Sequence, residues 1–376
     1  MTAVFDGANL RLVRCAQGLS LADVGEAVEK SKQYIQRIEA GTDTPTSQLV
    51  DALASFLNVE PEFLFAGDKQ ALREDVFHFR KLIGTKPTDK QAAMATGELF
   101  RKIVDFIDGT LRLPRVDFPE HDIGSPEAAE RAAEKCRIHW GLGVGPIGNM
   151  VRVVENAGAV VTTFESAGRG IDALSIAAPR PIVVTNSNDA SACRVRFDHA
   201  HEIGHLVGHV GRSTGDKATE AEANRFASAF LLPRSSFAKE FPALRGGTQI
   251  NWIALSEMKM RWRVSKAALL YRARQLGILS EDLYKRALIG HLFAKGERYG
   301  EREDSQIPHE SPELFDSAIS LLSERLGMSL EQIAASVKMK KALLLLVAPQ
   351  ARALERRSTS AVVSLRAYRK AAPVRI

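Results

Sequence analysis

The sequence has few cysteines, no long apolar run and no large excess of one charge sign. Its three cysteines, Cys15, Cys136 and Cys193, are widely spaced and odd in number, which excludes a disulfide framework and a cysteine-based zinc knuckle. The absence of an 18-residue apolar stretch predicts no transmembrane helix, and the N-terminal MTAVFDGANLRL lacks the apolar segment of a signal peptide. These absences favour a cytoplasmic protein with no membrane partner.

The charge is unevenly distributed along a chain of otherwise ordinary globular composition. The 376 residues include 51 Lys and Arg against 45 Asp and Glu, a net charge of +6, and the length favours two or three domains. Residues 1–66 hold nine acidic and five basic side chains, whereas residues 352–376 hold seven basic and one acidic. Net charge therefore gives no support for DNA binding by the N-terminal segment.

Helical and strand-like periodicities divide the chain into five segments. Residues 5–66 read as a run of short helices, and 67–125 as a helical linker that ends in a proline- and glycine-containing stretch. Residues 126–300 mix helical patterns with β-rich runs such as AVVTT and PIVVT, residues 301–350 are helical, and 351–376 form a basic tail. We find no internal repeat of fixed period. The expected fold class is mainly α with a small β-sheet: an all-α domain, then an α+β domain and a helical C-terminal region.

The N-terminal segment has the pattern of a helix-turn-helix. Ser20 and Asp23 have the spacing of a capping box, and the apolar residues that follow recur on one helical face. A second helix starts at Ser31 and ends at Gly41. Two short helices with a brief turn suit the major groove of DNA. The second helix would present Ser31, Lys32, Gln33 and Gln36 to the bases and phosphates. A small helical bundle for protein contact is the alternative.

Residues 199–233 carry the most specific chemistry. His201-Glu202-Ile203-Gly204-His205 is an H-E-x-x-H motif, and residues four apart on a helix share one face, so both imidazoles can reach one metal ion. Glu202 would then lie beside the metal, where it can accept a proton from water. A second amphipathic helix opens near Glu220, whose carboxylate can complete a His₂Glu zinc site, and Asn224 would hydrogen-bond a ligand histidine. Glu222 is the alternative ligand, although it points to a different face.

Two more histidines lie close to this motif. His209 follows His205 by four residues on the same face, but it does not have the spacing of a metzincin third ligand. We interpret it as a pocket-lining residue or a support for a ligand histidine, with a purely structural histidine as an equal alternative and a direct ligand as the weakest option. His199 is placed at the start of the helix and off the metal-facing side. A metal-free helix with packed histidines is the alternative for the whole site.

The N-terminal motifs resemble the Cro/repressor (XRE) helix-turn-helix family. The matching stretches are GLSLADVGEAV, SKQYIQRIEAG and LASFLNVEPEFL. The resemblance implies a double-stranded DNA operator as partner and a homodimer that reads two half-sites. Glu29 and Lys30 replace the glycine and apolar residue that are usual in the turn, so we expect an altered turn or a conformational cost at Glu29.

Residues 126–300 resemble the ImmA/IrrE-like metallopeptidase family. The matching stretches are GLGVGPIGNMVRVVENAG, IDALSI, RFDHAHEIGHLVGH, EAEANRFASAFLLP and WRVSKAALLYRARQLG. The resemblance implies a thermolysin-like minimal α+β core, Zn²⁺ bound by His201, His205 and Glu220, and Glu202 as general base. It also implies an endopeptidase that cleaves a partner repressor or antitoxin-like protein. The alternative is a transcriptional repressor or antitoxin of a toxin–antitoxin module, in which the peptidase fold senses or scaffolds with little turnover.

Three features outside these motifs leave alternatives open. His209 and Tyr271 are the candidates for a second donor to the oxyanion of the cleaved carbonyl. The stretch MSLEQIAASVKMKKALLLL, with Ser329 as an N-cap, is similar to another helix-turn-helix, but a plain helical cap is the simpler interpretation. The arginine-rich tail, which contains Tyr368, is interpreted either as a solvated end or as a contact for nucleic acid.

Overall fold

The computed structural model describes residues 4–65, 76–81, 86–163, 171–185, 190–212, 214–298 and 300–352. The chain forms two compact units, each assembled from segments that lie apart in the sequence. Residues 1–71, 86–113 and 313–376 make the first unit, and residues 72–85 and 114–312 make the second. The long helix of the segment 67–125 and the C-terminal helices therefore group with the N-terminal domain. No helix of the described part is both long and apolar enough to cross a membrane.

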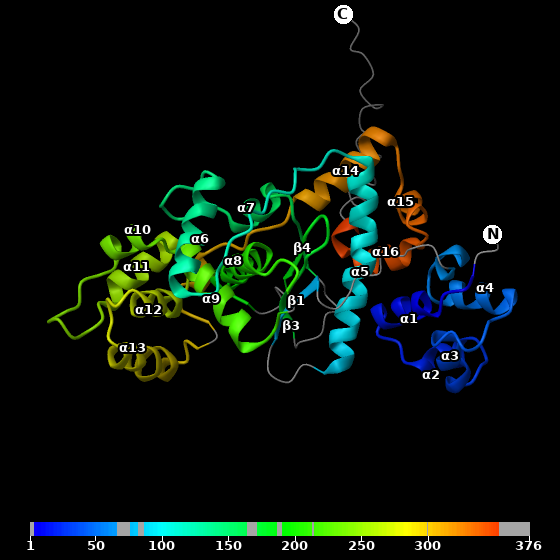
Figure 1. The fold of residues 1–376 in the computed structure, drawn as a ribbon, viewed down its shortest axis with the longest axis horizontal. Helices are drawn as coiled ribbons and strands as arrows, with labels where there is room; N and C mark the ends of the chain where they lie inside the picture. The colour runs from blue at the N-terminus through cyan, green and yellow to red at the C-terminus, as the bar shows by residue number, and fades with distance from the viewer. Residues whose placement is uncertain are drawn as a thin grey trace, which may run out of the picture. The chain divides into compact units, whose positions relative to one another are not determined.

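The described part of the first unit is helical, and polar side chains fix the starts of its early helices (Figure 1). The hydroxyl of Ser20 accepts the N–H of Asp23, and the carboxylate of Asp23 accepts the N–H of Ser20, which closes the expected capping box. Ser31 and Thr46 each cap the following helix with one hydrogen bond. The helices are α1 Gly7–Ala16, α2 Leu21–Ala27, α3 Lys32–Glu39, α4 Ser47–Phe56, α5 Pro87–Thr110, α14 Leu314–Leu326, α15 Leu330–Ser336 and α16 Lys341–Val347.

The turn between α2 and α3 contains no glycine, and Glu29 takes up the conformation that a glycine would favour there. Glu29 adopts the left-handed conformation, with φ of 54°. A side chain with a Cβ atom pays about 1–2 kcal/mol in this conformation, which glycine adopts freely. Of the two expected outcomes, the chain therefore shows the conformational cost at Glu29 and not an altered turn.

The second unit contains the small sheet, which has four strands in the order β1-β3-β4-β2. Strands β2 (Val160–Thr163) and β4 (Ile182–Thr185) lie in the β-rich runs identified from the sequence and pair in parallel. Strand β3 (Ile171–Ile176) pairs antiparallel with β4 on one side and with β1 (Phe77–Lys81) on the other. Strand β1 lies inside the segment read as a helical linker, so that segment is not helical throughout.

The helices of the second unit pack around a core in which α8 and α9 are central. Phe226, Phe230 and Trp262 are among its largest fully buried side chains. Helix α8 lies against β3, β4 and α9, so the residues of one α8 face meet the sheet and those of another meet α9. The helices are α6 Pro126–His139, α7 Met150–Asn156, α8 Ala192–Gly208, α9 Lys217–Leu231, α10 Arg234–Glu240, α11 Trp252–Trp262, α12 Lys266–Gln275 and α13 Glu281–Ala287.

Two glutamates near the C-terminal end of the second unit, Glu301 and Glu310, link helices that are distant in the sequence. Glu301 accepts the backbone N–H groups of Lys266 and Ala267 at the start of α12. Glu310 accepts the N–H groups of Met150 and Val151 at the start of α7 and also pairs with Arg196 of α8. A carboxylate at a helix N-terminus satisfies N–H groups that have no acceptor within the helix. These contacts hold α8, which carries the H-E-x-x-H motif, against α7.

Candidate metal centre and DNA-facing helix

Helix α8 brings the two histidines of the H-E-x-x-H motif together inside the protein. The helix is capped by Ser191 and buries His201 and His205, one turn apart on the face toward α9. Their Nε2 atoms are 3.0 Å apart. Gly204 lies between them, and a Cβ atom there would be 3.2 Å from the Cα of Ala223 in α9. The glycine therefore permits the close approach of the two helices.

Helix α9 supplies a carboxylate to the same point. Asp216 caps this helix by accepting the N–H groups of Ala218 and Thr219, which places Glu220 in the first turn. The two carboxylate oxygens of Glu220 lie 3.4 Å from Nε2 of His201 and 3.3 Å from Nε2 of His205. Among the described residues, these three side chains are the one group of His, Cys, Asp and Glu that could hold a metal ion.

The spacing of the three side chains fits a tetrahedral zinc site. Zinc binds histidine nitrogen and carboxylate oxygen at about 2.0–2.1 Å, so neighbouring ligand atoms of a tetrahedron are about 3.3 Å apart. The separations of 3.0, 3.3 and 3.4 Å lie close to that value. Two histidines and one carboxylate also leave the fourth position open, as in catalytic zinc sites. The donor set therefore fits a Zn²⁺ ion.

Outer hydrogen bonds orient both histidines so that their Nε2 lone pairs point to the shared position. Nδ1 of His201 is 3.0 Å from Oδ1 of Asn224, an oxygen that can only accept, so Nδ1 carries the proton. Nδ1 of His205 is 2.8 Å from Nδ1 of His209, whose Nε2 is 2.9 Å from the carboxylate of Glu222. Glu222 accepts the proton of His209 Nε2, so Nδ1 of His209 accepts from His205.

The sequence-based candidates thus separate into two layers. His201, His205 and Glu220 meet, while Asn224, His209 and Glu222 contact the histidines from outside. Glu222, the alternative third ligand, has its carboxylate on His209. Because both ring nitrogens of the buried His209 have partners within the protein, it is a poor candidate for an oxyanion donor.

Burial favours the neutral form of His205 and His199. Desolvation lowers the pKa of His205 to about 4, although the hydrogen bond to Glu220 pushes it upward. For Glu220, burial raises the pKa, but the hydrogen bonds and charges of His201 and His205 outweigh burial, so the pKa is lowered overall. A neutral imidazole and an ionised carboxylate are the forms that bind metal. His199 is fully buried away from this cluster, and burial lowers its pKa to about 4.

Glu202 is held by a residue that the sequence analysis did not select. The hydroxyl of Ser175 in β3 donates to Oε2 of Glu202, and both side chains are fully buried. Ser175 lies in the IDALSI stretch used for the family resemblance, where its role was not assigned. Side chains alternate between the two faces of a strand, and this pattern does not predict a contact with a residue 27 positions away. This contact fixes the orientation of the Glu202 carboxylate.

The start of α3 has the exposure required of a DNA-reading helix. Ser31 is the N-cap, and Lys32, Gln33 and Gln36 are exposed. The apolar positions Ile35 and Ile38 are fully buried on the opposite face. The four predicted contact residues are therefore available to a partner while the helix stays anchored in its domain.

The two regions match known families of domains. Residues 10–64 match the family model described as Helix-turn-helix, and residues 154–274 match a peptidase family model described as the IrrE N-terminal-like domain. The chain joins a helix-turn-helix domain to an IrrE N-terminal-like domain, in that order. Both resemblances inferred from the sequence are confirmed. No curated protein matches the chain.

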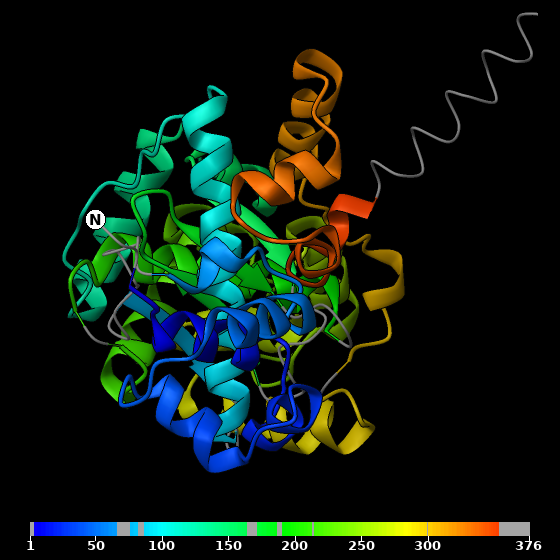
Figure 2. The same cartoon turned by 90° about the vertical axis from the view of Figure 1, so that its right-hand side faces the viewer.

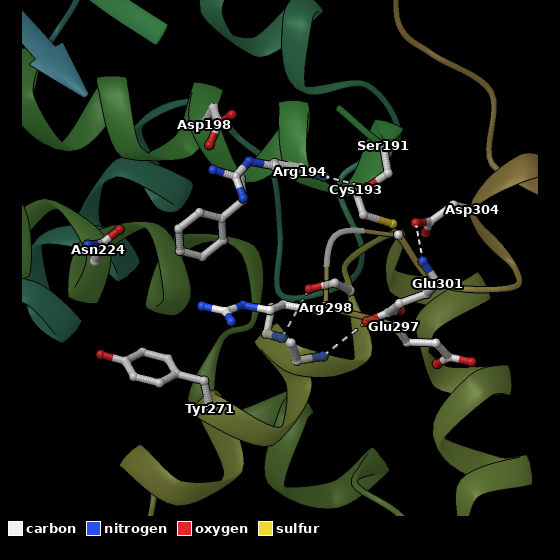
Figure 3. A pocket seen from close by; sticks show the side chains of 15 residues that line it. Ser191, Cys193, Arg194, Asp198, Asn224, Tyr271, Glu297, Arg298, Glu301 and Asp304 are labelled. Carbon is white, nitrogen blue, oxygen red and sulfur yellow. Dashed lines mark hydrogen bonds between the residues drawn. The ribbon is translucent and has the colours of Figure 1, made fainter. Parts of the chain in front are cut away.

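A cavity in the second unit is lined by residues of α8, α9 and α12 and by residues 297–304 (Figure 3). It has a volume of about 380 Å³ and shares Asn224 with the cluster, since this residue also binds His201. Tyr271 lies on the same side of the cavity as Asn224 (Figure 3). Its ring is stacked under Arg274, whose guanidinium carbon is 4.9 Å from the ring centroid. Of the two oxyanion candidates, Tyr271 is thus the one that faces a cavity.

Proposed function

We propose that the chain is a zinc-dependent endopeptidase joined to a DNA-binding domain, and that it regulates transcription by cutting a repressor or antitoxin-like protein. The observation that carries this proposal is the meeting of His201, His205 and Glu220 at 3.0–3.4 Å, with Glu202 between the two histidines in the sequence. Polar groups around the cluster fix the orientation of each histidine, as in catalytic zinc sites. The helix-turn-helix domain supports a regulatory role at DNA.

The chain's own residues provide the acid–base chemistry of peptide hydrolysis. A zinc ion in this site would lower the pKa of a water molecule and polarise the carbonyl of the peptide. Glu202 accepts a proton from the attacking water as its oxygen forms a bond to the carbonyl carbon. Glu202 then gives this proton to the departing amine as the carbon–nitrogen bond breaks. Ser175 keeps the carboxylate in place through both transfers.

The cavity lined by Asn224 and Tyr271 supports a binding site for an extended peptide. In this proposal Tyr271 donates its hydroxyl proton to the carbonyl oxygen while negative charge develops there. Its ring is fixed by Arg274, whose guanidinium also lies 4.7 Å from the centroid of Tyr284. A rigid donor loses little conformational entropy when it meets the transition state. Tyr271→Phe should therefore lower kcat more than it raises KM.

Zinc content tests the site independently of any substrate. Protein purified without added chelator should contain about one zinc per chain by elemental analysis, and His201→Ala should contain far less. Glu202→Gln should keep its zinc, because Glu202 is not a ligand in this scheme. Loss of zinc from Glu202→Gln, or no zinc in the wild type after incubation with the metal, would sink the assignment.

A reporter gene separates cleavage from a scaffolding role. If the chain acts by cutting a repressor, Glu202→Gln abolishes the transcriptional response of its target promoter. If the fold only senses or scaffolds, as in the alternative function, the variant regulates the promoter like the wild type. DNA binding is tested with Gln33→Ala, which removes a base-reading side chain and leaves the buried face of α3 intact.

A further inference from the structure

Residues 316–347 repeat the backbone of residues 7–38 with a constant increment of 309 in residue number. Helices α14, α15 and α16 take the places of α1, α2 and α3. Gly18 and Gly327 occupy equivalent positions and have φ angles of 68° and 66°. Glu29 and Lys338 are also equivalent, and both adopt the left-handed conformation, at 54° and 58°. The sequence-based statement that the chain has no internal repeat is therefore wrong for this region.

The hydrogen bonds of the two turns are the same. Ser329 forms a capping box with Gln332, as Ser20 does with Asp23. The N–H of Met339 donates to the carbonyl of Ala334 at 2.9 Å, and in the first copy Lys30 donates to Gly25 at 2.8 Å. Such a bond across five residues closes the turn between two helices.

The buried positions repeat as well. Each copy turns its apolar residues inward at the same places on three helices. The equivalent buried pairs are Leu10 and Ile319, Val13 and Leu322, Val24 and Ile333, Ile35 and Leu344, and Ile38 and Val347. Figure 2 shows α14, α15 and α16 as one consecutive group of orange to red helices. The backbone angles, the hydrogen bonds of the turn and the buried positions therefore all indicate a second helix-turn-helix.

We propose that this second helix-turn-helix does not read DNA. Instead, the turn before α16, at residues 338–340, serves as an intramolecular dock for the helix-turn-helix domain at residues 10–64. Two independent observations carry this proposal. One is the chemistry of the exposed positions of α16. The other is the set of contacts made by the turn before α16.

Two exposed positions of α16 carry side chains that cannot read base edges. The positions equivalent to Gln33 and Arg37 in α3 are Ala342 and Leu346 in α16, and both are exposed. Neither has a side-chain donor or acceptor, and base edges are distinguished by donors and acceptors. Lys341, the equivalent of Lys32, keeps a donor, but its ammonium group pairs with Glu331 at 2.9 Å. The helix therefore keeps the scaffold of a recognition helix and lacks polar groups at two positions that α3 exposes.

The turn that leads into α16, at residues 338–340, is bonded to the first domain. Met339 is 1 % exposed and forms a β-bridge with Val59, which follows α4. The N–H of Lys340 donates to the carbonyl of Asn58 at 2.9 Å, and the N–H of Glu60 donates to the carbonyl of Lys338 at 3.0 Å. These residues all belong to the first compact unit.

The same turn of the first copy is open. Lys30 and Ser31, the equivalents of Met339 and Lys340, are exposed. One chain therefore offers one DNA-reading helix, α3, and one docking helix, α16. An operator with two half-sites would need two chains, because the second copy cannot serve as the partner half.

Charge substitutions at equivalent positions test which copy meets DNA. The probe is the full chain with a short mixed-sequence duplex at low salt. Gln33→Glu and Arg37→Glu in α3 should each weaken binding about tenfold, since they put a negative charge against phosphates and base acceptors. Their matched controls, Ala342→Glu and Leu346→Glu in α16, should change binding by less than about twofold. Equal weakening by the two sets would overturn the proposal.

The dock is tested without DNA by removing one hydrogen bond. Glu60 has φ of −77°, which proline adopts, so Glu60→Pro deletes its N–H and keeps this angle. Hydrogen exchange of the backbone amides in α15 and α16 should become about two- to tenfold faster, because one hydrogen bond of the dock is lost. Ser47→Pro at the first position of α4 is the control, where proline is tolerated and exchange should not change. Unchanged exchange in Glu60→Pro would refute the dock.

Discussion

Glutamine substitutions at positions 220 and 222 separate a residue that meets the metal from one that supports a ligand. Glu220 lies within 3.4 Å of Nε2 of both His201 and His205, whereas Glu222 contacts His209, 2.9 Å away. Glu220→Gln keeps the size of the side chain and removes its negative charge. Glu222→Gln keeps an oxygen that can still accept the proton of His209 Nε2.

The two substitutions should differ strongly in their effect on zinc affinity. Protein zinc sites bind with about 10–16 kcal/mol in total, so each of three side chains contributes about 3–5 kcal/mol. Loss of the Glu220 charge should weaken binding by about a hundredfold to a thousandfold. Loss of an outer partner costs about 10- to 100-fold, and the retained hydrogen bond places Glu222→Gln near the lower value.

Competition with a fluorescent zinc chelator of known affinity measures both variants at pH 7. Glu222→Ala serves as the matched control, because it removes the hydrogen bond as well as the charge and should fall between the other two. The reasoning would be refuted if Glu222→Gln weakened zinc binding as much as Glu220→Gln. In that case zinc binding would depend on both charges equally, and Glu220 could not be distinguished from Glu222 as the ligand.

Three other predictions concern positions around the site and in the first domain. Ser175→Ala should lower kcat about tenfold and leave zinc content unchanged, because it frees the Glu202 carboxylate; steady-state kinetics and elemental analysis check this. Glu29→Gly should stabilise the chain by up to about 1 kcal/mol in urea unfolding, since glycine relieves the left-handed strain. The metal-free chain should lose stability as pH falls from about 6.5 to 4. His199 and His205 have a folded-state pKa of about 4, so the unfolded chain takes up their protons first. His199→Leu should remove roughly half of this loss when denaturation midpoints are compared at several pH values.

The sequence predicted that His201, His205 and Glu220 lie close together, because they are local to two helices. The spacing of His201 and His205 by four positions places them on one helical face, and the same spacing joins Glu220 to Asn224. Gly204 lies between the two histidines in the sequence, and its lack of a Cβ atom permits the close approach of α8 to α9. Periodicity therefore suffices where the geometry is set by helical turns.

Features that depend on distant contacts could not be predicted in this way. Ser175 meets Glu202 because β3 packs on α8, and no spacing rule joins a strand residue to a helix residue. Strand β1 pairs with β3, although three helices and one strand lie between them in the sequence. The similarity of residues 328–346 to a second helix-turn-helix was visible in the sequence, but the plain helical cap was the simpler interpretation, because Ala342 and Leu346 stand where α3 has polar side chains.

New protein N-termini in cells test the central claim most directly. Wild-type chain and Glu202→Gln are expressed at equal levels, and newly formed N-termini are labelled and identified by mass spectrometry. The account predicts a small set of N-termini in a partner protein that appears with the wild type and is absent with Glu202→Gln, while both proteins contain zinc. The same set of N-termini with both proteins would contradict a peptidase that acts through Glu202.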